Sequence, residues 1–313
     1  MKSHMNLRDL VKSAMAAFVV AFASVALFPR ALAAAEAAKE PAPAGGQGDW
    51  PLFALCMDTH DAMKRTLAQQ AEMLKELGYA GAGHLWLDKL AERIETLDAA
   101  GLTLYQIYIR LDVAPGAKQP YDPKLKGVLP LLKGRPTMLA VLVSGGKPGD
   151  QAGDERAVEL LREIAGLARP FGVRVALYPH VGNWLEKLDD AIRVADKVDR
   201  PNVGVMFNLC HFLKTGQEKD LPALLAKASP RLMAVSVNGS PTGADVRAGK
   251  GAWIAPLGEG GFDMAGLLRT LKAVGYKGPM GLQCYGIRGD AREHLARSMA
   301  AWRKLCAALA GKG

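Results

Sequence analysis

The sequence predicts an α/β fold, a closed (β/α)8 barrel that forms a single domain. From residue 50 onward, short apolar runs rich in β-branched residues alternate with longer amphipathic stretches, which is typical of parallel strands covered by helices. Eight such units fit the usual size of a closed barrel, about 250 residues. No G-x-G-x-x-G motif follows the first run, although a doubly wound dinucleotide-binding sheet normally carries one there.

The predicted strands are residues 51–57, 80–86, 102–109, 137–143, 173–179, 203–208, 232–238 and 279–285. Between them, Leu, Ile, Val and Ala recur at intervals of three and four residues in stretches such as 63–78, 155–172 and 184–199, as amphipathic helices require. Several of these stretches end in glycine, a common helix stop. Ligands of such barrels bind at the C-terminal ends of the strands, so functional residues are sought there.

Residues 1–33 predict a secretory signal peptide. Basic residues precede an apolar run over 14–28, and Ala31-Leu32-Ala33 supplies a small-residue cleavage site. A retained membrane anchor is the alternative, but the run is shorter than the roughly 20 apolar residues of a spanning helix, and Pro29 and Arg30 end it. We therefore expect a periplasmic or secreted protein with no stable membrane anchor after cleavage.

Residues 34–49 are rich in Ala, Pro and Gly and lack apolar periodicity, so they predict a flexible leader before a barrel over residues 50–313. The formal charge of +9 is spread along the chain, without the basic and aromatic clusters of a nucleic-acid binder, so no nucleic-acid partner is expected. Cys56, Cys210, Cys284 and Cys306 lie far apart without C-x-x-C spacing, which indicates core or pocket thiols and leaves one disulfide open.

Polar side chains gather where the predicted strands end. Two histidines, His180 and His211, are the candidates for acid/base catalysis, and they are expected to point into the barrel mouth. The candidates for binding a sugar-like ligand, with donor and acceptor groups or a stacking ring, are Tyr178, Asn208, Ser236, Asn238, Gln283 and Trp184. Trp86 and Trp253 are further possible stacking platforms. The alternative for each is a structural role in packing or loop bonding.

Four segments resemble the xylose-isomerase-like TIM barrel superfamily of sugar phosphate isomerases and epimerases, which also contains type 2 apurinic (AP) endonucleases. They are VALYPHVG (175–182), FNLCH (207–211), AVSVNGS (234–240), and PLGEGGFD (256–263) before GYKGPMGLQ (275–283). The resemblance implies a divalent metal held by Glu, Asp, His and Glu on strands five to eight. This sequence has Tyr178, Asn208, Ser236 and Gln283 there. Hard cations prefer carboxylate oxygens, so no metal and no other cofactor is expected.

The resemblance and the neutral pocket together predict an isomerase, an epimerase or a related lyase that acts on a small sugar or keto-sugar. His211 matches the strand-six histidine that touches substrate in the family, and His180 leaves its strand on the same face as Tyr178. A non-catalytic sugar-binding barrel is the main alternative. A three-histidine metal site with His84 is a remoter one. An endonuclease is disfavoured because its zinc ligands and basic stripe are missing.

Overall fold

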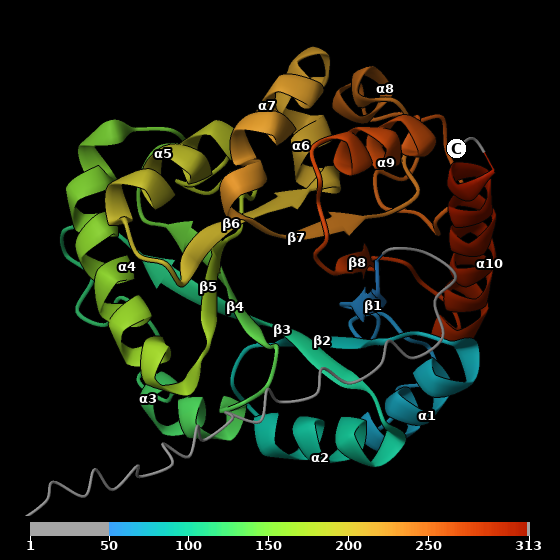
Figure 1. Cartoon of the computed structure of the whole chain (residues 1–313), viewed down its shortest axis with the longest axis horizontal. Coiled ribbons are helices and arrows are strands. Elements are labelled where there is room, and N and C mark those ends of the chain that lie inside the picture. The colour runs from blue at the N-terminus through green and yellow to red at the C-terminus, as the bar shows by residue number, and fades with distance from the viewer. Residues whose placement is uncertain (1–49, 312–313) are drawn as a thin grey trace, which may run out of the picture. The chain divides into compact units, whose positions relative to one another are not determined.

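The computed structural model describes residues 50–311, which form a closed barrel of eight parallel strands in chain order, with β8 paired to β1 (Figure 1). The strands are β1 (Leu52–Leu55), β2 (Gly81–Leu85), β3 (Thr103–Asp112), β4 (Met138–Ser144), β5 (Arg174–Leu177), β6 (Val203–Asn208), β7 (Leu232–Val237) and β8 (Met280–Gln283). The predicted (β/α)8 barrel is therefore confirmed. The predicted signal peptide and leader lie outside the described residues.

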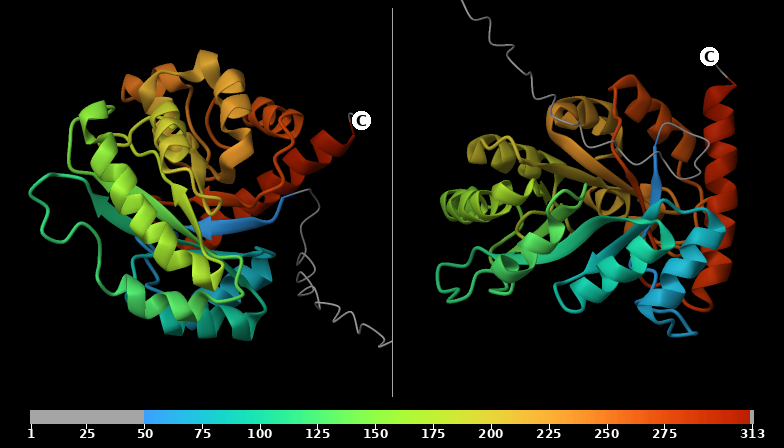
Figure 2. Two further views of the ribbon diagram at one scale, coloured as in Figure 1. Left: turned by 60° about the vertical axis from the view of Figure 1, so that its left-hand side comes forward. Right: turned by 60° about the horizontal axis from the view of Figure 1, so that its bottom comes forward.

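The helices surround the strands, as the two views in Figure 2 make clear. They are α1 (Leu67–Leu77), α2 (Leu90–Ala100), α3 (Leu125–Val128), α4 (Asp154–Ala168), α5 (Leu188–Val198), α6 (Leu209–Thr215), α7 (Leu221–Ala228), α8 (Gly243–Arg247), α9 (Met264–Ala273) and α10 (Ala291–Ala310). Short 3-10 helices are η1 (Leu129–Leu132), η2 (Gln151–Gly153), η3 (Arg169–Phe171), η4 (Glu218–Asp220) and η5 (Ser229–Arg231). Within residues 50–311, no helix is long and apolar enough to cross a membrane.

Local sequence accounts for the element boundaries. Thr66 and Gln69 form a capping box at the start of α1, each side chain accepting from the other residue's backbone N–H. Gly78 ends the helix with a φ of 85°, which glycine adopts without strain. On β2, a Cβ at Gly81 would collide with the carbonyl oxygen of Thr103, so glycine allows β2 and β3 to approach each other closely.

Side chains alternate between two cores because successive residues of a strand face opposite sides of the sheet. The outward residues pack against the helices in a large apolar layer. The inward residues fill the barrel as a smaller cluster of Phe53, Leu55, Tyr108, Met138, Ala140, Ala176, Tyr178, Met206 and Ala234. Two inward residues of this cluster are tyrosines near the C-terminal ends of their strands. The packed interior therefore ends in a polar layer under the barrel mouth.

Candidate active site at the barrel mouth

A cavity of about 610 Å³ opens at the C-terminal ends of the strands. Its lining residues come from strands β2, β3, β4 and β8 and from the segments that follow β1, β5, β6 and β7. They are Cys56, Leu85, Trp86, Tyr108, Arg110, Leu142, Ser144, Tyr178, His180, Asn183, His211, Trp253, Ile254, Gln283 and Tyr285. This is where a (β/α)8 barrel places its active site, and the volume suits a small ligand.

The floor of the cavity is a hydrogen-bonded group of Tyr108, Tyr178 and Gln283. Gln283 Nε2 donates to the Tyr178 hydroxyl at 3.3 Å and to the Tyr108 hydroxyl at 3.5 Å, and its Oε1 accepts from the backbone N–H of Tyr285. The Tyr108 hydroxyl also donates to that of Tyr178, which leaves the Tyr178 proton free to point into the cavity. Burial raises the pKa of both tyrosines well above its usual value, so both hydroxyls stay neutral donors.

The two predicted catalytic histidines meet above this floor, with ring centroids 3.8 Å apart. Backbone groups of Val181 set the proton position on each ring. His180 Nδ1 lies 2.9 Å from the Val181 carbonyl oxygen and must donate to it, whereas His211 Nδ1 accepts from the Val181 N–H at 3.4 Å. His180 Nε2 is therefore an unprotonated acceptor and His211 Nε2 carries a proton. Neighbouring rings thus offer one base and one hydrogen-bond donor.

Both imidazoles are held in the neutral form. Burial lowers the pKa of His211 well below its usual value, and the neighbouring His180 and Lys214 lower it further. Burial also lowers the pKa of His180, against the opposing effect of its bond to Val181. His211 packs edge-on against Tyr178 and Trp253, at centroid distances of 6.0 and 5.4 Å. The pair is thus fixed in position and uncharged near neutral pH.

The positions that hold metal in the family resemblance bond to one another here. Asn208 Oδ1 accepts from the Ser236 hydroxyl at 2.7 Å and from the Cys210 thiol at 3.4 Å, while Tyr178 pairs with Gln283. All four side chains are neutral, and in residues 50–311 no three His, Cys, Asp or Glu side chains lie together as a metal site requires. This donor set does not fit a hard divalent cation.

Five nominated residues lie outside the cavity, Trp184 and four others. Asn208 and Ser236 are buried beneath it and bond to each other. Asn238 donates to the carbonyl oxygens of Gly239 and Trp253, so it ties down the loop after β7. His84 is engaged by the Asp88 carbonyl and by Arg93, away from the other two histidines. The three-histidine alternative therefore has no geometric support.

The assignment of Trp184 as a stacking platform also needs correction. Its side chain is 2% exposed, and a Cβ at Gly146 or Gly153 would collide with its ring. Its indole N–H donates to the Asp150 carbonyl at 2.7 Å. Trp184 is a packing residue under the loop after β4. Trp86 and Trp253, in contrast, do line the cavity.

Three residues that line the cavity were not predicted from the sequence: Arg110, Tyr108 and Asn183. Tyr108 and Arg110 lie on one face of β3, as two-residue spacing requires. The predicted strand ended at residue 109, one residue before Arg110. The two-residue periodicity of a strand, counted from Tyr108, was the signal that could have identified Arg110. Asn183 follows a turn after β5, and no sequence pattern marks it.

The thiols behave as core groups. Cys56, Cys210 and Cys284 are free thiols, so none of these three forms the disulfide that the sequence left open. Cys56 lines the cavity, but burial raises the pKa of its thiol to about 12, with a smaller contribution from Asp58. A thiolate is the nucleophilic form, so Cys56 is a poor nucleophile in this environment.

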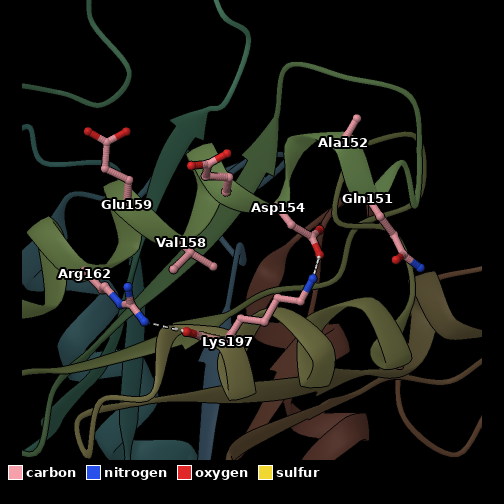
Figure 3. Close-up of a pocket in the computed structure, with 8 residues that line it drawn as sticks. Gln151, Ala152, Asp154, Val158, Glu159, Arg162 and Lys197 are labelled. Atoms are coloured by element: carbon pink, nitrogen blue, oxygen red, sulfur yellow. Dashed lines mark hydrogen bonds and ion pairs between the residues drawn. The ribbon is translucent and has the colours of Figure 1, made fainter.

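Two further hollows lie outside the barrel mouth. The one in Figure 3 lies between α4 and α5, where Asp154 is paired with Lys197 at 2.6 Å and with Arg193, and Arg162 donates to the Lys197 carbonyl. Its charged groups already satisfy one another. The other holds Glu259, which is paired with Arg297 at 2.8 Å, in keeping with a loop carboxylate that fixes its turn. In both hollows the carboxylate is already paired with a basic side chain.

Comparisons with known proteins agree with this architecture. A sequence profile described as the xylose isomerase-like TIM barrel matches residues 131–306, more than half of the chain. No curated protein sequence matches. Among solved structures, the IolI protein with a bound zinc atom superposes with a TM-score of 0.66 at 17% identity, covering 82% of this chain and 98% of its own.

Two sugar epimerases have the same fold. The 3-keto-D-glucoside 4-epimerase YcjR from E. coli gives a TM-score of 0.64 at 17% identity, covering 82% of this chain and 100% of its own. A D-allulose 3-epimerase from Methylomonas sp. gives 0.63 at 15% identity, covering 82% and 98%. At these identities the likeness concerns the fold alone. With the profile match, it establishes that the chain belongs to the xylose isomerase-like TIM barrel family.

Proposed function

We propose that this protein is an exported sugar isomerase or epimerase that moves a proton on a small sugar or keto-sugar without a divalent metal. The observation that carries the proposal is the close histidine pair, with opposite protonation at the two Nε2 atoms, above a floor of neutral donors. The fold that the chain shares with two sugar epimerases supports the same class of substrate.

The geometry assigns distinct roles to the two imidazoles. His180 Nε2 takes the proton from the carbon next to a substrate carbonyl, and becomes the imidazolium. His211 donates a hydrogen bond from Nε2 to the carbonyl oxygen as a neutral imidazole, and the Tyr178 hydroxyl adds a second donor to the developing enolate. Returning the proton to the former carbonyl carbon, while the proton of the adjacent hydroxyl moves to the former carbonyl oxygen, gives isomerisation. Returning it to the same carbon after the enediolate has turned its opposite face to His180 gives epimerisation.

Neutral donors replace the charge that a metal would supply. A well-placed donor to an oxyanion stabilises a transition state by about 3 to 4 kcal/mol, and His211 and Tyr178 supply two. The four positions that hold metal in the family resemblance, Tyr178, Asn208, Ser236 and Gln283, are neutral and bonded in pairs. These contacts support a mechanism that needs no metal.

Proton exchange in deuterium oxide tests the proposal directly. The mature protein, treated with a chelator, is incubated with a panel of aldoses and ketoses, and deuterium at the carbon next to the carbonyl is followed by NMR. We expect exchange in the wild-type protein and its loss in His180→Gln and His211→Asn. His294→Leu, which removes a buried histidine from α10 outside the cavity, is the matched control and should retain exchange. Exchange that appears only after Mn²⁺ or Zn²⁺ is added would contradict the metal-free mechanism.

The pH dependence of the exchange provides a second test. His180 must be neutral to act as a base, and burial lowers its pKa. The acid limb of the rate profile should therefore lie below the ordinary histidine value of about 6.5. A limb above this value, or one that is unchanged in His180→Gln, would exclude His180 as the base.

A non-catalytic sugar-binding barrel is the second candidate. The observation that favours it is the hydrogen-bonded, uncharged floor of Tyr108, Tyr178 and Gln283, which can hold hydroxyl groups without any chemistry. Thermal stabilisation by sugars with no deuterium exchange would select this candidate. The absence of both stabilisation and exchange would reject the two proposals together.

A further inference from the structure

The cavity lining carries positive charge but no negative charge. Among its lining residues, all within the described part of the chain, there is no Asp or Glu, the two histidines are neutral, and Arg110 is the one permanently charged group. Asp58 is close enough to influence Cys56 but does not line the cavity. A second cation, Lys214, lies 3.9 Å over the ring of Trp253 just outside it. The mouth therefore presents positive potential to an entering ligand.

Arg110 is held in place without its hydrogen-bonding capacity being used. Its guanidinium carbon lies 4.1 Å over the ring of Trp86, a cation–π contact that fixes the plane of the group. It makes no ion pair or hydrogen bond with any other group in residues 50–311. Its five N–H donors lie in the plane of the guanidinium and therefore remain available around its edge.

The backbone of Trp86, whose ring lies beneath Arg110, is in an energetically unfavourable conformation. Trp86 has a φ of 64°, in the left-handed region that bulky side chains rarely adopt, and Cys56, which lines the same cavity, has a φ of 54°. Such conformations are retained where a binding site requires them. Trp86 keeps this unfavourable backbone conformation while the face of its ring lies against Arg110. This is a second observation that the site holds the guanidinium in a defined position.

The distance between Arg110 and the floor matches a short, hydroxylated chain. Arg110 is two residues beyond Tyr108 on the same face of β3, which corresponds to about 7 Å along the strand. A ligand of five or six carbons spans that distance. One end would meet the guanidinium at the rim while the other meets the Tyr178 and Gln283 hydrogen bonds and the histidine pair.

We propose that the ligand of this site is an anionic sugar, a sugar acid whose carboxylate binds Arg110 through two parallel hydrogen bonds. The inference deepens the proposed function and rests on it. The planar guanidinium matches a carboxylate in shape, and the single charge lining the cavity matches a single negative charge. A phosphate dianion would leave one charge without a partner in the lining. A neutral sugar would leave the Arg110 donors to water.

Affinity measurements on matched ligands test this assignment. The probes are D-gluconate, D-xylonate and D-galacturonate, their neutral counterparts D-glucose, D-xylose and D-galactose, and D-glucose 6-phosphate as the phosphate arm. Each is titrated by calorimetry against the full mature protein and its variants. The loss of a hydrogen bond to a charged group lowers affinity by about 10- to 100-fold. At least one sugar acid should therefore bind at least about tenfold more tightly than its neutral counterpart.

The variants separate the carboxylate contact from general effects. Arg110→Met keeps an aliphatic contact with Trp86 and should weaken the sugar acid about 10- to 100-fold while leaving the neutral sugar within about twofold. Arg110→Lys keeps the charge without the planar arrangement of donors. Its affinity for the sugar acid should therefore lie between that of the wild-type protein and that of Arg110→Met. The matched control is Arg200→Met, which removes an exposed arginine just before β6, at the opposite end of the barrel. Thermal melts verify that every variant is folded.

The outcomes distinguish this inference from the proposed function. Equal binding of acids and neutral sugars, or equal weakening of both in Arg110→Met, would overturn the sugar-acid assignment and leave the proposed function intact. Tighter binding of D-glucose 6-phosphate through Arg110, with no preference for carboxylates, would replace the carboxylate with a phosphate. If no probe binds, the inference and the proposed function both fail.

Discussion

His294 provides a test of how burial controls charge in this fold. The His294 side chain is 2% exposed on α10, and its Nδ1 has no hydrogen-bond partner among the described residues. Burial and, to a smaller extent, Arg297 lower the pKa of the imidazole to about 4, while Asp61 and Asp290 act in the opposite direction. The folded protein therefore keeps His294 neutral where an unfolded chain would protonate it.

The sign and size of the effect on stability follow from linkage. An unfolded histidine titrates near 6.5, so the unfolded state binds more protons as the pH falls below that value, and the folded state loses stability. With a folded pKa of about 4, the loss from His294 alone reaches about 2 kcal/mol at about pH 5 and levels off at about 3 kcal/mol below the folded pKa. Above about pH 7 the contribution is close to zero.

His294→Leu removes this titration and also the unpaired Nδ1, so we expect little loss of stability at neutral pH. Urea unfolding at about pH 7.5 and about pH 5 gives the free energy of unfolding for each protein at each pH. The wild-type protein should lose more stability on acidification than the variant does, by about 2 kcal/mol. The other buried histidines titrate in both proteins and cancel. An identical acid-induced loss in the two proteins would show that His294 is already accessible to protons in the fold.

Three further outcomes are expected. Trp184→Ala should lower the free energy of unfolding by about 3 to 5 kcal/mol, because it removes a buried ring and its bond to Asp150, and it should leave sugar affinity unchanged; loss of affinity with full stability would restore Trp184 to the binding site. Asn208→Asp should destabilise the fold increasingly as pH rises, because a carboxylate would be buried beside Ser236 without a cation, and urea unfolding with and without Mn²⁺ would reveal any rescue. N-terminal mass analysis of exported material should find a mature chain that begins near Ala34, and a chain that keeps residues 18–28 would contradict the signal peptide.

The strands could be predicted closely because each is a short apolar run between amphipathic stretches, and that pattern reports burial directly. The predicted run 203–208 coincides with β6, and 232–238 exceeds β7 by one residue. Predicting β3 to end at residue 109 was the larger error. The observed strand continues to Asp112, because Arg110 is an exposed residue that lines the cavity and so interrupts no buried row.

The site could be predicted only in part, because a sequence gives the face of a strand but not the depth of a side chain below the mouth. His180, His211, Tyr178 and Gln283 share the cavity as predicted. Asn208 also points inward, but it lies one layer lower, where its carbonyl oxygen meets Ser236. Trp184 failed for a different reason. It follows β5 beyond a turn, and the turn directs it outward under the loop after β4.

The four positions that match the family's metal ligands in the sequence resemblance form two hydrogen-bonded pairs. Asn208 and Ser236 bond across β6 and β7, while Tyr178 and Gln283 bond across the barrel between β5 and β8. Each pair satisfies a polar group that would otherwise be buried without a partner, so one change without the other would cost stability. The result is a neutral, rigid floor beneath the histidines. The one permanent charge in the cavity lining belongs to Arg110, at the rim, where it can act on the ligand.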